Sequence, residues 1–299
     1  MKGKKLNNGE IIPLIGLGGL KKDIVENIEE IVYYSIKDGI RLIETDPNLK
    51  NEEEIGKGIK KALDERLVKR DELFIIGKLW ITNKSDPEKA LKKTLKKLQI
   101  DYLNLYVDQW PTSINHGNKK DIETVSIYDL WPKMENLIKE NLTKSIGVSN
   151  YNIQALNNLL SFCKIRPVVN GIEFHPYCYR KNMITLCEKM NITLLAYYPL
   201  AKNYQEDLFI DEKTNNQINN IINKLERKYR KTSTQIILNW HKRLGTIPIV
   251  STSLINATEE NLEALEFDLG EEGINNLGNL DKKIIINDNR QIFGYNIMA

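Results

Sequence analysis

The 299-residue chain is 41% hydrophobic and carries 43 basic against 40 acidic residues, for a formal net charge of +3. This length and apolar content suffice for one large α/β domain or two small ones, and the balanced charge argues against nucleic acid as a partner. The basic start, MKGKKLNNGE, precedes no apolar stretch, and no later run approaches the length of a membrane span. We therefore expect neither secretion nor membrane insertion.

The three cysteines, Cys163, Cys178 and Cys187, show neither CxxC spacing nor a paired histidine cluster. An odd number of cysteines without such spacing argues against a disulfide framework and against a zinc site. We predict reduced packing residues in a cytoplasmic protein that binds no metal.

At the start of the chain, Asn8-Gly9 lies between Leu6 and Ile11, which predicts a tight hairpin that could plug one end of a larger structure. Apolar runs and helical patterns alternate from there. The expected strands are 14–19, 41–44, 73–79, 102–108, 145–149, 168–174, 194–199 and 246–251. The expected helices are 24–38, with Gly39 as its stop, 51–62, one from Pro87, 130–138, 153–162, 183–190, 218–243 and one near 259.

The run Leu73 to Leu79 is continuously apolar, as is typical of a strand buried on both faces of a parallel sheet. Eight β/α units without a linker-like break predict a closed (β/α)₈ TIM barrel with an N-terminal β-hairpin, as a single domain over 1–299 with a tail from about 283 to 299. An open doubly wound sheet is the alternative. It lacks its expected glycine-rich turn, because Gly16, Gly18 and Gly19 do not form a GxGxxG pattern.

Ordered strings along nearly the whole chain resemble the aldo-keto reductase family. They are LNNGEIIPLIGLG, GIRLIET with NEEEIG, ELFIIGKLW, LQIDYLNLY with WP, LTKSIGVSNYN, RPVVNGIEFHPY, LLAYYPL and ENLE. The resemblance implies a cytoplasmic, monomeric reductase that binds NADP(H) or NAD(H) and transfers hydride to the carbonyl carbon of a small molecule. Such a reaction needs a proton donor and an electrostatic stabiliser beside the carbonyl oxygen.

Carried onto this chain, the four catalytic positions of the family fall on Glu44, Leu49, Lys78 and Gln109, and only Lys78 matches. Glu44 replaces an aspartate and keeps a carboxylate, so we expect it to form a structural ion pair with Lys78. Gln109 replaces a histidine and still offers an amide donor. Leu49 replaces the proton-donating tyrosine, and a hydrocarbon can neither donate a proton nor stabilise an oxyanion.

The resemblance also assigns residues to the nicotinamide half of the cofactor. Ser149 and Asn150 match the pair that holds the carboxamide, and Tyr197 matches the residue that stacks on the ring. Leu200 matches in the pyrophosphate loop. The usual glutamine partner of the carboxamide clamp is replaced by Gly171.

At the adenosine end the resemblance places Ser251, Thr252 and Ala257 where relatives carry the lysine, serine and arginine that hold the 2′-phosphate of NADPH. Glu260 and Asn261 match the residues that contact adenine. A phosphate without these cations loses charge-assisted hydrogen bonds of roughly 1.5–3 kcal/mol each. Dinucleotide binding is therefore expected to be weak or lost.

Two hypotheses follow, beside a third reading, an abundant structural or storage protein of the crystallin kind, for or against which the sequence offers nothing. In the first, the chain is a catalytically impaired pseudoenzyme whose barrel binds a protein partner or a small ligand. In the second, it is an active but divergent NAD(P)H-dependent oxidoreductase that reduces aldehydes or ketones, with water or a nearby tyrosine as proton donor.

Overall fold

Eight parallel strands close into a barrel in the computed structural model, which describes residues 3–113, 125–201, 212–252, 257–287 and 293. In barrel order they are β3 (Gly16–Leu17), β4 (Leu42–Glu44), β5 (Phe74–Leu79), β6 (Leu105–Asp108), β7 (Ile146–Ser149), β8 (Val169–Glu173), β9 (Thr193–Tyr197) and β10 (Ile247–Val250). β10 pairs with β3 and completes the ring. The predicted (β/α)₈ barrel is confirmed.

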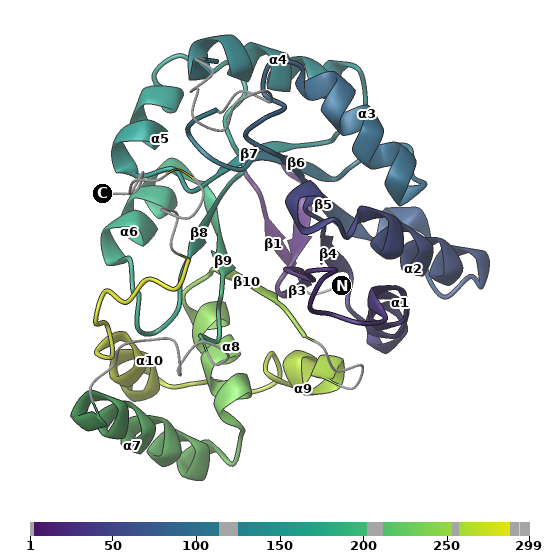
Figure 1. Cartoon of the computed structure of the whole chain (residues 1–299). Helices are drawn as coiled ribbons and strands as arrows, with labels where there is room; N and C mark the ends of the chain where they lie inside the picture. Colours follow the sequence, from purple (N-terminus) through teal and green to yellow (C-terminus); the bar gives the residue numbers. More distant parts are fainter. Residues whose placement is uncertain (1–2, 114–124, 202–211, 253–256, 288–292, 294–299) are drawn as a thin grey trace.

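Helices surround the strands as an outer ring (Figure 1). They are α1 (Ile28–Asp38), α2 (Glu52–Asp64), α3 (Pro87–Leu98), α4 (Ile127–Lys139), α5 (Ile153–Leu160), α6 (Lys181–Met190), α7 (Glu212–Tyr229), α8 (Ser233–Arg243), α9 (Ala257–Glu263) and α10 (Glu271–Gly278). Short 3₁₀ helices η1 (Pro47–Leu49) and η2 (Arg70–Glu72) complete the elements. No helix of the described residues is long and apolar enough to span a bilayer.

The predicted hairpin is present as β1 (Gly3–Lys5) and β2 (Ile11–Pro13), which pair in antiparallel register. Its Leu6 and Ile12 are buried in the same cluster as the residues that fill the barrel interior. The hairpin therefore closes the amino-terminal end of the barrel with apolar side chains, and the carboxyl ends of the strands are left for the site.

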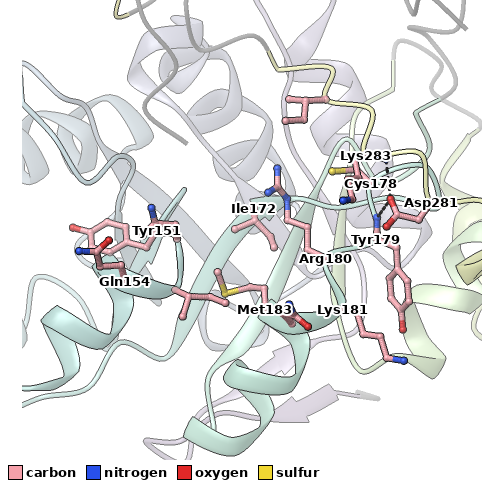
Figure 2. A pocket seen from close by; sticks show the side chains of 14 residues that line it. Tyr151, Gln154, Ile172, Cys178, Tyr179, Arg180, Lys181, Met183, Asp281 and Lys283 are labelled. Carbon is pink, nitrogen blue, oxygen red and sulfur yellow. Dashed lines mark hydrogen bonds between the residues drawn. The ribbon is translucent and has the colours of Figure 1, made fainter. Parts of the chain in front are cut away.

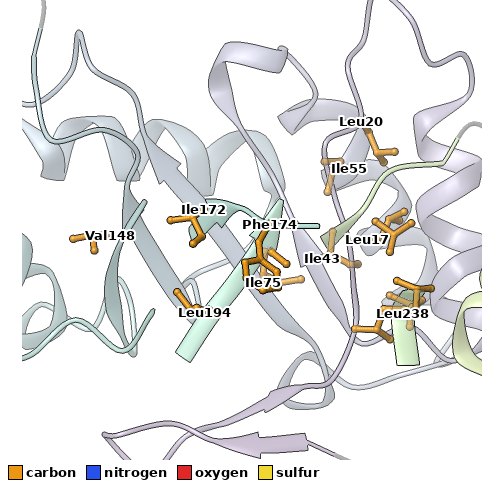
Figure 3. Close-up of a cluster of buried hydrophobic side chains, with 14 of the residues drawn as sticks. Leu17, Leu20, Ile43, Ile55, Ile75, Val148, Ile172, Phe174, Leu194 and Leu238 are labelled. Carbon is orange, nitrogen blue, oxygen red and sulfur yellow. The ribbon is translucent and has the colours of Figure 1, made fainter. Parts of the chain in front are cut away.

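Side chains of each strand alternate between the barrel interior and the helices. Residues such as Leu42, Ile76 and Val107 fill the interior. The residues adjacent to them in the strands, such as Ile43 and Ile75, belong to the larger cluster between the strands and helices (Figure 3). This alternation fixes which side chains can face the barrel axis.

The expected helix over 218–243 is wrong as a single element. α7 ends at Tyr229, and Arg230 adopts a left-handed conformation with φ 51°. Thr232 then begins α8 with a capping box, in which its hydroxyl accepts from the Gln235 amide and the Gln235 side chain accepts from the Thr232 amide.

The remaining differences concern the ends of helices. α1 begins at Ile28 rather than 24 because Asn27 has φ 57°, outside the helical region. Gly39, with φ 117°, ends the helix as predicted. α10 was not expected from the sequence. Of the expected tail, 288–292 and 294–299 lie outside the described residues.

Candidate active site

The last inward-facing position of several strands carries a polar or glycine residue above the apolar interior. Glu44 lies two residues after Leu42, and Lys78 lies two residues after Ile76. Gln109 likewise follows Val107 by two residues. Because the period of a strand is two, these side chains all face the axis at the carboxyl end of the barrel. The other residues of this layer are Ser149, Gly171 and Tyr197.

Lys78 forms the expected ion pair with Glu44, with 2.8 Å between Nζ and Oε1. A second carboxylate, that of Asp46, lies 3.4 Å from the same Nζ. The side chains of Lys78 and Glu44 are only 7% and 1% exposed. Burial by itself would lower the pKa of Lys78, but Glu44, Tyr197 and Asp46 outweigh burial and raise this pKa above its ordinary value. Lys78 is therefore a charged lysine held between two carboxylates.

Asp46 was not among the residues singled out from the sequence, because it belongs to none of the family positions. It follows β4 and caps η1, where its Oδ1 accepts from the amide of Asn48. Its Oδ2 accepts a hydrogen bond of 2.7 Å from Nε2 of Gln109. Its position could have indicated this role, because Asp46 lies two residues beyond Glu44 and side chains two residues apart along a strand point to the same face.

Leu49 ends η1 and is half-buried. Its backbone amide donates to the carbonyl oxygen of Asp46 at 3.0 Å. The side chain contributes no hydrogen-bonding group to the cluster of Glu44, Asp46, Lys78 and Gln109. The position to which the resemblance assigns the proton donor is therefore apolar.

The ring of Tyr197 lies over Lys78, with 4.4 Å between Nζ and the ring centroid. Its hydroxyl is shielded from solvent, and burial together with Glu44 raises the pKa of the phenol against the opposing effect of Lys78. Gly171 makes this arrangement possible. A Cβ at Gly171 would lie 2.5 Å from Cε2 and 2.8 Å from the hydroxyl oxygen of Tyr197. Tyr197 can therefore occupy this inward position only because residue 171 has no side chain.

We expect Gly171→Ala to displace Tyr197 and to lower the free energy of unfolding by about 1–3 kcal/mol, the usual cost of overpacking. Urea denaturation measures the cost. The same substitution in a Tyr197→Ala background removes the obstacle and should cost little. An equal cost in both backgrounds would mean that Tyr197 does not occupy this space.

The residues assigned to the carboxamide clamp are bonded to the protein itself. The Ser149 hydroxyl donates to the carbonyl oxygen of Gly171 at 2.8 Å, and Nδ2 of Asn150 donates to the carbonyl oxygen of Gln109 at 2.9 Å. Asn150 has φ 61°, so it also serves as the turn residue after β7. These bonds fix the loop next to Gly171 and Gln109.

The residues assigned to the adenosine end lie after β10 and on α9. Ser251 is exposed and donates to the carbonyl oxygen of Gly19, while Glu260 accepts from the hydroxyl of Thr232. Asn261 is buried. The remaining assigned residues, Leu200, Thr252 and Ala257, are half-buried. Neither Ser251 nor Thr252 can supply a positive charge.

A second buried ion pair supports the segment that carries Gln109. Lys84 lies 2.7 Å from Oδ1 of Asp108, and it also donates to the carbonyl oxygen of Trp110. The Tyr151 hydroxyl donates to the same carboxylate at 2.7 Å. Burial lowers the pKa of Lys84 and raises that of Asp108. As expected from strand alternation, Asp108 faces away from the barrel axis.

A closed barrel of eight parallel strands with a polar cluster at the carboxyl ends of those strands defines a TIM-barrel protein whose candidate site lies at the face where such barrels carry their active sites. The chain belongs to the Aldo/keto reductase family, whose model matches residues 15–282. Within the described residues no group of side chains has the arrangement of a metal site.

Relatives similar to this chain include several reductases. It is 33% identical to aldo-keto reductase family 1 member A1 of Gallus gallus over 93% of this chain and 88% of that protein. It is 34% identical to an NAD(P)H-dependent D-xylose reductase of Pachysolen tannophilus over 95% and 94%. An NADP-dependent D-sorbitol-6-phosphate dehydrogenase of Malus domestica is 33% identical over 93% of each chain.

Solved structures agree. A Bombyx mori aldo-keto reductase in complex with NADP superposes with a TM-score of 0.90, at 28% identity over 98% of this chain and 97% of that one. The aldose reductase of Schistosoma japonicum gives a TM-score of 0.88 at 28% identity, over 99% and 97%. The family is therefore established by sequence and by structure.

Proposed function

We propose that this chain is an aldo-keto reductase-like protein in which carbonyl reduction is catalytically impaired, so that the barrel serves as the scaffold of a pseudoenzyme. The observation that carries the proposal is Leu49 at the position of the proton donor. General acid catalysis contributes about a hundredfold to ten-thousandfold to such a step, and a hydrocarbon supplies none of it.

The charges of the cluster point the same way. Glu44 and Asp46 both lie within ion-pair distance of Lys78, so two carboxylates face one cation. Hydride arriving at a carbonyl carbon pushes negative charge onto the oxygen, which positive groups stabilise and a surplus carboxylate opposes. Gln109 already donates from Nε2 to Asp46.

The cofactor of the family fits these residues only in part. Gly171 offers no side chain to a carboxamide, and Tyr197 lies against it. Ser251, Thr252 and Ala257 hold no cation for a 2′-phosphate. Two of the relatives named above, the D-sorbitol-6-phosphate dehydrogenase and the D-xylose reductase, are NADP- and NAD(P)H-dependent respectively. For this chain we infer weak dinucleotide binding without preference for NADPH.

An active, divergent NAD(P)H-dependent oxidoreductase acting on small carbonyl compounds is the second candidate. It is favoured by Tyr197, whose ring lies over Lys78 and whose phenol takes the place of the missing proton donor in this candidate. Its raised pKa makes it a weaker acid than an ordinary tyrosine. Any carbonyl reduction by the purified protein should then be lost in Tyr197→Phe.

A fluorescence titration with NADPH and NADH tests the proposal. We expect millimolar dissociation constants that differ little between the two. The double variant Ser251→Lys/Ala257→Arg adds two cations. It should lower the dissociation constant for NADPH by about tenfold to hundredfold per restored contact and leave that for NADH unchanged. Submicromolar, NADPH-selective binding by the unaltered protein, with reduction of aldehydes, would refute the impairment and leave the second candidate.

The pseudoenzyme proposal also implies a partner, either a protein or a small ligand, at the loop-bearing carboxyl face of the barrel. We further propose that the protein is a monomer of the cytoplasm. The monomeric state and the cytoplasmic location rest on the resemblance to the family.

A further inference from the structure

A cavity of about 750 Å³ lies outside the barrel, between the amino-terminal ends of α5 and α6 and the chain segment 281–285 (Figure 2). Ile172 and Met183 line it and are buried. Two exposed apolar residues also line it: Ile153 is 40% exposed and Ile285 is 46% exposed. The cavity thus offers an apolar surface that continues to its opening.

The wall formed by the segment 281–285 is bonded to the loop that precedes α6. The carbonyl oxygen of Tyr177 accepts from the amides of Lys282 and Ile284. The carboxylate of Asp281 accepts from the amide of Tyr179 at 3.2 Å. Hydrogen bonds to the loop before α6 therefore hold this wall of the cavity in place.

The lining carries more positive than negative charge. Arg180, Lys181 and Lys283 line the cavity, and Asp281 is the one carboxylate among the described residues that line it. Within the described part of the chain none of the three cations forms an ion pair. Burial raises the pKa of the Cys178 thiol to about 11, so this neighbour is neutral at pH 7 and supplies no counter-charge.

Arg180 is held where it can serve a ligand. Its Nε donates to the carbonyl oxygen of Glu173 at 3.3 Å, and Figure 2 places the side chain in the centre of the lining residues, near Ile172. α6 begins one residue later and has no side-chain cap at its amino terminus. The positive end of the helix dipole adds to the positive potential.

We propose that this cavity binds an organic anion with an apolar body, such as a carboxylate on an aliphatic chain. The carboxylate pairs with Arg180 and Lys283, and the chain lies on Ile172 and Met183. A volume of this size is ordinary for a small-molecule site, in which apolar walls supply contact and a few charged groups supply orientation. The cavity is separate from the cluster around Lys78, so this proposal does not depend on the proposed function.

Octanoate is the probe, and octan-1-ol is its uncharged counterpart of equal chain length. Calorimetric titration of the full-length protein should give one octanoate site and clearly weaker binding of octan-1-ol. Arg180→Gln and Lys283→Gln should each raise the dissociation constant for octanoate by about tenfold to hundredfold, as expected when a charge-assisted hydrogen bond is lost. Neither variant should change the affinity for octan-1-ol.

Lys189→Gln is the matched control, because Lys189 is exposed on the same helix and does not line the cavity. Its octanoate affinity should equal that of the unaltered protein. If Arg180→Gln fails to fold, Lys283→Gln carries the test, since Lys283 is exposed. Equal affinity for octanoate and octan-1-ol, or an octanoate affinity unchanged in Lys283→Gln, would overturn the proposal.

Discussion

We expect the Leu49→Tyr variant to reduce aldehydes about a hundredfold to ten-thousandfold faster than the unaltered protein, in kcat/KM, because it restores a hydroxyl where the family places its proton donor. Lys78 is charged and its side chain faces this end of the barrel, where the family resemblance places residue 49 next to it. The comparison is best made in the Ser251→Lys/Ala257→Arg background, where dinucleotide binding does not limit the rate.

Leu49→Phe is the control for this experiment, because it adds the same ring without the hydroxyl. A gain in Leu49→Tyr that Leu49→Phe does not share assigns the effect to proton donation. Equal activities in the two variants, with dinucleotide binding demonstrated by titration, would contradict the placement of residue 49 in the site. Asp46→Asn should add to the gain, because it removes the surplus carboxylate near Lys78.

Lys78→Met should lower the free energy of unfolding by about 3–5 kcal/mol, the usual cost of stranding a buried charge. It leaves the carboxylates of Glu44 and Asp46 buried without a cation. Urea denaturation at neutral pH measures the loss. The triple variant Lys78→Met/Glu44→Gln/Asp46→Asn should recover most of it, because no unpaired charge then remains.

Lys60→Met is the matched control, since Lys60 and Asp64 form an exposed pair with side chains 52% and 62% exposed. Such pairs contribute about 0–1 kcal/mol. A Lys78→Met cost as small as that of Lys60→Met would contradict the buried pairing.

The pH dependence of stability offers an independent check on Lys78. Its pKa is raised in the folded protein, so the stability that it confers is complete below the ordinary lysine pKa of 10.5 and declines as the pH rises above that value. Lys78→Met should lack this part of the alkaline decline.

The barrel and its closing hairpin could be predicted from local patterns in the sequence. Apolar runs such as Leu73 to Leu79 and the turn at Asn8-Gly9 are local signals, and each strand was recognised from its own residues. The direction of Glu44, Lys78 and Gln109 is also local, because alternation along a strand sets the face of each side chain. The ends of helices were less predictable, since they depend on single backbone conformations such as that of Arg230.

The contacts of these side chains could not be predicted in the same way, because they depend on how separate elements pack. Asp46 contacts Lys78 and Gln109 because the register of the neighbouring strands brings these side chains to the same height along the barrel axis. Tyr197 reaches Lys78 because the space beside it is empty at Gly171, a matter of volume between strands. The anion cavity joins segments more than a hundred residues apart in the chain. Pairing and free volume are properties of packed elements, so no single stretch of sequence contains them.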